Sequence, residues 1–251
     1  RIVPREMTVV GVGVRGEGDP ELAQIIDADR RAPTLPRFIQ RRQQQRRQQR
    51  DDRDHNQQFD QCESFDVSAV NISLGYNQYS DRASCDSEGA SSGYSAAVNR
   101  LRSNGTAVVA ATGNSSSGTG IAFPACLSGV FGVGSTNDAG TASTFSNRNA
   151  LMSFWAPGEF IVSSVPGGRM ASASGTSMAT PHVTGAFAAL GAARPTATID
   201  DLAARLAATG TAVVGDPNNK PRIDLWRALG IDDFAQALPV APSANAPVSA
   251  A

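Results

Sequence analysis

Residues 174–185 read Ser-Gly-Thr-Ser-Met-Ala-Thr-Pro-His-Val-Thr-Gly, and this stretch decides how the rest of the chain is interpreted. It places Ser177 between a glycine-threonine turn and an apolar helix predicted over 177–193. The unpaired N–H groups of a first helical turn and the positive end of the helix dipole favour an anion there. A nucleophilic serine needs such surroundings, because the carbonyl oxygen it attacks becomes an oxyanion. A lone serine before a helix is more often an N-cap, so the inference depends on the whole string.

The twelve-residue string resembles, almost letter for letter, the nucleophile motif of the subtilisin-like serine peptidases. The resemblance implies that Ser177 attacks the carbonyl carbon of a peptide bond. Residues 107–114, Ala-Val-Val-Ala-Ala-Thr-Gly-Asn, read as a buried strand ending in Gly-Asn, which alone is usually a turn. In the family, the Asn that ends this strand segment donates a side-chain N–H to the oxyanion, so the resemblance gives that role to Asn114. Residues 145–147, Phe-Ser-Asn, are similar to a further landmark of the family.

A third segment, Val70-Asn71-Ile72-Ser73-Leu74-Gly75, is similar to the family's strand whose edge pairs with the substrate backbone. An extended peptide added to a sheet edge gains main-chain hydrogen bonds, and a side-chain pocket then sets its preference. The resemblance implies a pocket wall of small side chains, which leaves room for a bulky substrate residue. The edge residues are Ser73, Leu74 and Gly75, and the wall residues are Ala110, Ala111, Thr112 and Gly113.

Strands and helices alternate along the chain, which is typical of a parallel sheet covered on both faces. The resemblance covers roughly residues 60–230 and implies a three-layer α/β subtilisin-like fold with a mostly parallel sheet between helices. We expect one partial peptidase domain over 1–235, with a Gln-, Arg- and Asp-rich insertion at 37–60 and an Ala-, Pro- and Ser-rich tail at 236–251. The predicted helices are 20–30, 90–103 and 177–193, and the predicted strands are 107–111, 130–135, 160–165 and 169–174.

The family's other two catalytic motifs do not occur in these 251 residues. They are an Asp in Asp-Ser/Thr-Gly and a His in His-Gly-Thr, which supply the base and its orienting carboxylate. His182 follows Ser177 by five residues, which turns it away from the nucleophile's side of the helix and predicts a structural, hydrogen-bonded histidine. His55 has carboxylate neighbours, so a triad can be drawn with it, but its polar surroundings offer no packed helix to hold it.

The start of the chain suggests where the missing groups come from. The chain begins at Arg1 without a Met or a signal peptide, and Arg1-Ile2-Val3-Pro4 resembles the family strand that follows the catalytic His. We therefore expect the sequence to be the C-terminal part of a larger catalytic domain, with an N-terminal segment carrying the Asp and the His. The chain as given should then be nearly inactive by itself.

Composition limits the partners and cofactors. The net charge of −1 provides no field that would attract nucleic acid, and no apolar run approaches the eighteen residues of a membrane span. Structural calcium is common in the family, but no Asp-rich loop here has a convincing ligand spacing, so we predict neither a metal site nor a cofactor. Polypeptides remain the expected substrates.

Three cysteines are an odd count. The resemblance implies a Cys85–Cys126 disulfide, because the family groups most similar to this chain pair a Cys after the Ser-Leu-Gly strand with one in a Pro-Ala-Cys context. Cys62 is then left over and could pair with a Cys of the missing N-terminal portion. A disulfide implies a secreted or extracytoplasmic protein.

Two other functions stay open. Gly11-Val12-Gly13-Val14-Arg15-Gly16 matches the Gly-x-Gly-x-x-Gly pattern of dinucleotide sites, but Glu17-Gly18-Asp19-Pro20 intervenes where a helix should begin at once. The second alternative is a non-catalytic scaffold that binds peptides through the Ser73–Gly75 edge without cleaving them. Against it stand Ser177 and Asn114, which a binding module has no chemical reason to keep.

Overall fold

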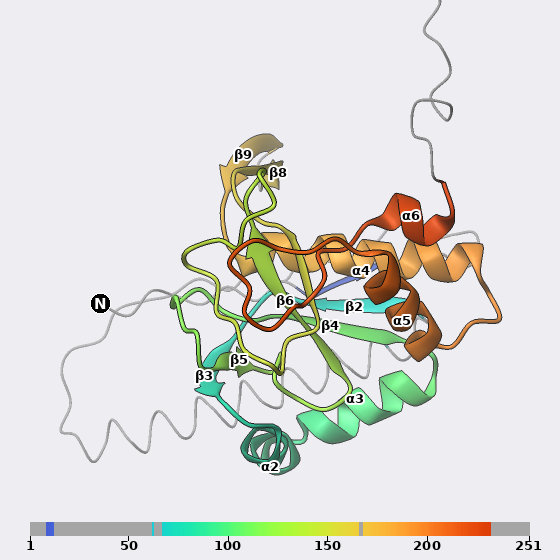
Figure 1. Cartoon of the computed structure of the whole chain (residues 1–251). Helices are drawn as coiled ribbons and strands as arrows, with labels where there is room; N and C mark the ends of the chain where they lie inside the picture. The colour runs from blue at the N-terminus through green and yellow to red at the C-terminus, as the bar shows by residue number, and fades with distance from the viewer. Residues whose placement is uncertain (1–8, 13–61, 63–66, 166–167, 232–251) are drawn as a thin grey trace, which may run out of the picture.

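The central sheet of the computed structural model has five strands in the order β1-β2-β4-β6-β7. Figure 1 labels β2, β4 and β6 of this sheet. The structure describes residues 9–12, 62, 67–165 and 168–231. The strands β2, β4, β6 and β7 run parallel, and β1 pairs antiparallel with β2 at one edge. The prediction of a mostly parallel sheet is therefore confirmed. The strands are β1 (Val9–Val12), β2 (Ala69–Ile72), β4 (Ala107–Ala111), β6 (Val130–Thr136) and β7 (Phe154–Pro157).

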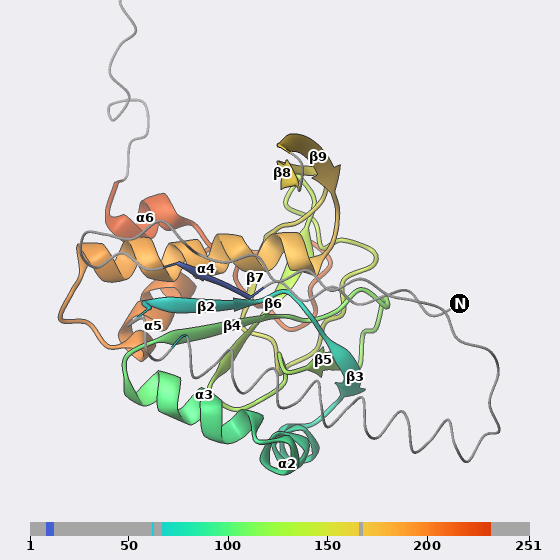
Figure 2. The ribbon, with the colours of Figure 1, turned by 180° about the vertical axis from the view of Figure 1, so that it is seen from behind.

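Helices cover both faces of this sheet, as Figures 1 and 2 show from opposite sides. One apolar cluster joins Val108 of β4 to Val98 and Leu101, and the other joins Val109 to Val183 and Phe187. Neighbouring residues of a strand point to opposite faces, so a strand buried on both faces must be apolar throughout. The three-layer α/β fold is confirmed. The helices are α2 (Arg82–Ser92) and α3 (Tyr94–Ser103) on one face, and α4 (Thr176–Ala193), α5 (Ile199–Thr209) and α6 (Leu225–Leu229) on the other.

The helix predicted over 90–103 is two helices, so its predicted start is wrong. Helix α2 begins after Asp81, whose side chain accepts a hydrogen bond from Ser84 N at 2.8 Å. Gly93, with φ 84°, ends α2 and redirects the chain into α3, because glycine adopts this left-handed conformation without steric cost. The predicted end is confirmed, since Asn104 caps α3 and Gly105 follows with φ 77°.

A disulfide joins Cys85 of α2 to Cys126, with Cα atoms 6.0 Å apart and a sequence separation of 41. The pairing implied by the family resemblance is therefore present. Arg82, one turn before Cys85, donates to the backbone carbonyls of Cys126 and Leu127. Hydrogen bonds and the disulfide therefore both tie α2 to the segment at 126–127. Cys62 is a buried free thiol, and burial raises its pKa above the ordinary value.

Two short antiparallel ribbons complete the fold. β3 (Tyr76–Tyr79) pairs with β5 (Ile121–Phe123), and β8 (Ile161–Val165) pairs with β9 (Arg169–Ala173) in a hairpin that projects from the body (Figure 1). The hairpin confirms the two β-rich pieces predicted before Ser177. The predicted helix 20–30, the insertion 37–60 and the tail 236–251 lie outside the described residues.

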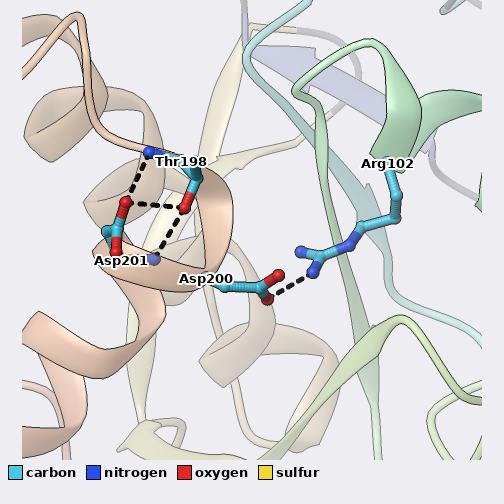
Figure 3. A network of polar contacts seen from close by, with 4 residues as sticks. All are labelled: Arg102, Thr198, Asp200 and Asp201. Atoms are coloured by element: carbon cyan, nitrogen blue, oxygen red, sulfur yellow. Dashed lines mark hydrogen bonds and ion pairs between the residues drawn. The ribbon is translucent and has the colours of Figure 1, made fainter.

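Helix α5 is fixed at its start by polar contacts (Figure 3). Thr198 and Asp201 form a capping box, in which each side chain bonds the other's backbone N–H. Hydrogen bonds from Thr198 hold the pKa of Asp201 below its usual range. Arg102 of α3 pairs with Asp200 and places its guanidinium 4.9 Å from the ring centroid of Phe131. The Arg102–Asp200 pair therefore links α3 on one face of the sheet to α5 on the other, beside the start of β6.

Candidate active site

The first turn of α4 places Ser177 beside the end of β2. The Ser177 hydroxyl donates to Ser73 O at 3.1 Å, and the Ser73 hydroxyl donates to Ser177 O at 2.9 Å, across 104 residues of sequence. Pro181 makes the second bond available. In a helix, Ser177 O would accept from the N–H of residue 181, and proline has none. The proline in the motif therefore frees a carbonyl that ties the candidate nucleophile to the candidate substrate edge, a role that the sequence reasoning missed.

Thr176 orients the side chain of Asn114. The Asn114 Oδ1 accepts from both Thr176 N and Thr176 Oγ1, each at 2.9 Å, so the amide oxygen faces the start of α4. Thr176 Oγ1 also accepts from Gly113 N at 3.2 Å. With Oδ1 committed, Nδ2 is the half of the amide that can donate elsewhere. The N–H of Ser177 lies in the same first turn, where helical geometry provides no intrahelical acceptor. The sequence predicted Ser177 and Asn114 but gave no sign of this use of Thr176.

The predicted substrate edge follows β2 directly. Ser73 accepts from Asn71 Nδ2 at 2.9 Å, Leu74 is half-buried, and Gly75 is exposed. A Cβ on Gly75 would lie 2.7 Å from the Cβ of Ala122, so only glycine fits there without a shift. The edge is thus short, close to β5, and joined to Ser177 through Ser73.

The predicted pocket wall is the end of β4 and the residues after it. Ala110, Ala111 and Thr112 are buried, and Gly113 is half-buried. The Thr112 hydroxyl donates to Asn147 O at 2.9 Å and to Val133 O at 3.2 Å, so it serves the scaffold. The first two wall residues are small, apolar and buried, and their part in a substrate pocket stays a prediction.

His182 bonds within its own helix. Its ring nitrogen Nδ1 lies 2.9 Å from Met178 O, one turn earlier in α4, and the residue is exposed. The prediction of a hydrogen-bonded histidine is confirmed. His55 lies outside the described residues.

The glycine-rich match at 11–16 starts inside a strand. Gly11 and Val12 belong to β1, where Gly11 pairs with Val70, and the remaining residues of the match are not described. A dinucleotide site needs these glycines in the turn after a strand, so the first part of the match does not fit.

In the described part of the chain, no helix combines the length and apolar character needed to cross a membrane. Among the same residues, no three His, Cys, Asp or Glu side chains gather as metal ligands do.

Several known proteins are similar in sequence to part of this chain. Subtilisin Savinase of Lederbergia lenta is 46% identical over 92 residues, which are 37% of this chain and 34% of that protein. Alkaline elastase YaB of Bacillus sp. (strain YaB) is 46% identical over 92 residues, or 24% of its length. The chain thus matches about a quarter to a third of the length of these relatives.

Solved structures give a longer match. The prenylagaramide maturation protease PagA aligns with a TM-score of 0.59 and 25% identity, over 72% of this chain and 67% of that chain. The self-cleaved protease domain of PatA aligns with a TM-score of 0.57 and 26% identity, over 71% and 66%. The family model described as "Subtilase family" matches residues 42–224, which is most of the sequence. The chain belongs to the subtilase family.

Proposed function

We propose that this chain carries the nucleophile and the oxyanion hole of a serine endopeptidase. The observation that supports it best is the meeting of three distant segments. The Ser177 hydroxyl lies 3.1 Å from Ser73 O, at the candidate substrate edge, and the adjacent Thr176 N bonds Asn114 at 2.9 Å. A nucleophile, an oriented amide and a strand edge are three parts that peptide-bond cleavage through an acyl-enzyme needs in addition to a base.

The proposed reaction has two halves. In the first, Ser177 Oγ forms a bond to the scissile carbonyl carbon while its proton passes to a histidine base, and the Ser177 N–H with Asn114 Nδ2 holds the oxyanion. The histidine then gives that proton to the leaving nitrogen as the C–N bond breaks. In the second half, water loses a proton to the histidine and attacks the acyl carbon, and Ser177 leaves with the proton restored.

The histidine and its partner Asp are proposed to come from an N-terminal segment, since their family motifs do not occur in these residues. Removing a triad member lowers turnover about 10⁶-fold, a value measured in subtilisin and taken over here. We therefore propose that the 251 residues alone hydrolyse peptides hardly at all and that adding such a segment restores turnover.

Polypeptides are the proposed substrates, bound as an added strand along Ser73, Leu74 and Gly75. This mode reads the main chain, so it accepts many sequences. We propose a secreted or extracytoplasmic location, since the Cys85–Cys126 disulfide persists in oxidising compartments. No cofactor, metal or nucleic acid has a part in the proposed chemistry.

The test is labelling by a fluorophosphonate together with hydrolysis of a chromogenic peptide by the full-length gene product. We expect Ser177→Ala to abolish both, because the attacking oxygen is gone. The matched control is Ser172→Ala, which removes an exposed hydroxyl from β9 and should leave both unchanged. Labelling that persists in Ser177→Ala would refute the assignment of the nucleophile.

A second candidate function is a peptide-binding domain without catalysis. The absence of the family's Asp and His motifs from the sequence favours it. It predicts that a peptide binds the full-length gene product, that the peptide stays intact, and that Ser177→Ala binds it equally well. Turnover that depends on Ser177 would exclude this function.

A further inference from the structure

We propose that Asn147 is the positioning residue of the oxyanion site. It holds the loop of residues 112–117 so that Asn114 presents its amide to the reacting carbonyl. This inference rests on the proposed function of Ser177 and Asn114, and it concerns a residue that bonds the loop without belonging to it. The sequence marked 145–147 only as a family landmark.

The Asn147 side chain bonds the loop backbone on both sides of Asn114. Its Nδ2 donates to Thr112 O at 3.0 Å, and its Oδ1 accepts from Ser115 N at 2.9 Å and from Ser117 N at 3.0 Å. The residue is only 1% exposed, so its side-chain amide is shielded from competing water. Both lone pairs of Oδ1 are used, which fixes the amide in one orientation.

The backbone of Asn147 adds two further bonds to the same loop. Asn147 N donates to Gly113 O at 2.9 Å, and the Thr112 hydroxyl donates to Asn147 O at 2.9 Å. One residue therefore bonds positions 112, 113, 115 and 117. Asn114, in the middle, directs its side chain to Thr176 at the start of α4. The loop is held from one side by Asn147 and presents Asn114 to the other.

Gly113 makes this close approach sterically feasible. Its φ is +99°, and a Cβ there would lie 2.5 Å from Asn147 Nδ2. The loop is neither helix nor strand, so its N–H and C=O groups need partners from outside. Without the Asn147 side chain, Ser115 N and Ser117 N lose these partners and Thr112 O keeps only Ala122 N, so the loop must shift to find water. A shift of about 1 Å at a catalytic group can cost about 10²-fold in rate.

The test is a double-mutant cycle in the full-length gene product: the wild type, Asn147→Ala, Asn114→Ala, and both changes together. We expect Asn147→Ala to lower kcat about 10- to 100-fold while KM changes less than about threefold. In the Asn114→Ala background, the same change should alter kcat less than about threefold, because the residue through which Asn147 acts is already gone. An equal loss of kcat in both backgrounds, or no loss in either, would overturn the proposal.

The cycle also separates this proposal from the proposed function. If Asn114→Ala leaves kcat at the wild-type value, the oxyanion assignment is wrong, and the positioning proposal is overturned with it. If Asn114→Ala lowers kcat and Asn147→Ala does not, the oxyanion assignment stands and only the positioning proposal is overturned.

A second measurement does not need turnover. Amide hydrogen exchange should accelerate at Ser115 and Ser117 in Asn147→Ala beyond the change seen at core amides of β4. The matched control is Asn149→Ala, since Asn149 is also a buried asparagine, and it donates to Thr119 O and Tyr79 O and accepts from Leu151 N. That variant should leave kcat unchanged and should accelerate exchange at Ser115 no more than at the core amides of β4. Equal acceleration in both variants would show a general loss of stability and overturn the proposal.

Discussion

The loop 112–117 and the β8–β9 hairpin both lead into the candidate active site, yet they are held in opposite ways. The loop bonds a distant buried residue, Asn147, and contains a glycine that no larger residue could replace without strain. The hairpin is held by the backbone pairing of its own two strands, in which Ile161 lies opposite Ala173 and Val165 opposite Arg169. Large apolar side chains in and beside the hairpin stay exposed. Their exposed fractions are 73% for Phe160, 63% for Val162 and 65% for Met170. The loop's conformation is therefore set by the whole fold, and the hairpin's by local pairing.

Removing the disulfide has the largest expected effect and separates the two regions. The Cys85→Ala/Cys126→Ala variant should lose about 4 kcal/mol of unfolding free energy, because the cross-link closes a loop of 41 residues in the unfolded chain. Urea unfolding measures the loss. Amides of Ser115 and Ser117 should exchange about 10³-fold faster, since they open only with the whole domain. Hairpin amides, which open locally, should keep their rates.

Cys62→Ala is the matched control for the disulfide variant, because it removes a buried sulfur that forms no cross-link. It should cost much less stability than the double change. Hairpin exchange that accelerates as much as loop exchange would break the contrast between the regions, because it would show that both open by global unfolding.

Gly113→Ala comes next. A Cβ at φ +99°, 2.5 Å from Asn147 Nδ2 and 3.2 Å from the Cβ of Ala122, should cost about 3 kcal/mol in urea unfolding. Gly118→Ala is the control, because in the described part of the chain only its neighbours in sequence come within 4 Å of its Cβ position, and its φ is not in the left-handed range. That change should leave stability the same or raise it by less than about 1 kcal/mol. Equal costs at the two glycines would mean that the loop adapts easily.

Gly168→Ala applies the same change to the hairpin. Gly168 also has a positive φ, +70°, but no described residue other than its chain neighbours has an atom within 4 Å of its Cβ position. The backbone strain then remains without a steric clash, so the expected cost is about 1 kcal/mol. The difference from Gly113→Ala, measured by the same urea unfolding, isolates the contribution of tertiary packing. A cost at Gly168 as large as that at Gly113 would show that the hairpin is also fixed by the body of the domain.

The sequence predicted the parts of this molecule that depend on local pattern. Buried strands such as 107–111 are apolar runs between helices, and the string around Ser177 is long enough to be specific. The single helix over 90–103 was wrong because Gly93 reads equally well as a tolerated helical glycine and as a cap. Only its φ of 84° distinguishes the two.

The support of the candidate site could not be predicted, because it depends on contacts between distant residues. Pro181 frees Ser177 O for Ser73, across 104 residues, and nothing near either residue indicates the other. Asn147 reaches the loop across about thirty residues and bonds backbone atoms, which carry no sequence signal. The sequence names the reacting groups, whereas their orientation requires the fold.

Val162→Thr has the smallest expected effect and tests the hairpin most directly. Threonine keeps the branched shape of valine and its preference for strands, and the hydroxyl faces solvent at this exposed position. Unfolding free energy should change by less than about 0.5 kcal/mol, and the kcat of the full-length gene product should not change. A clear loss of stability in the full-length product would mean that Val162 is covered there, because hiding a hydroxyl without a partner is costly. The hairpin would then be held by long-range packing, as the loop is, and the contrast between the two regions would no longer hold.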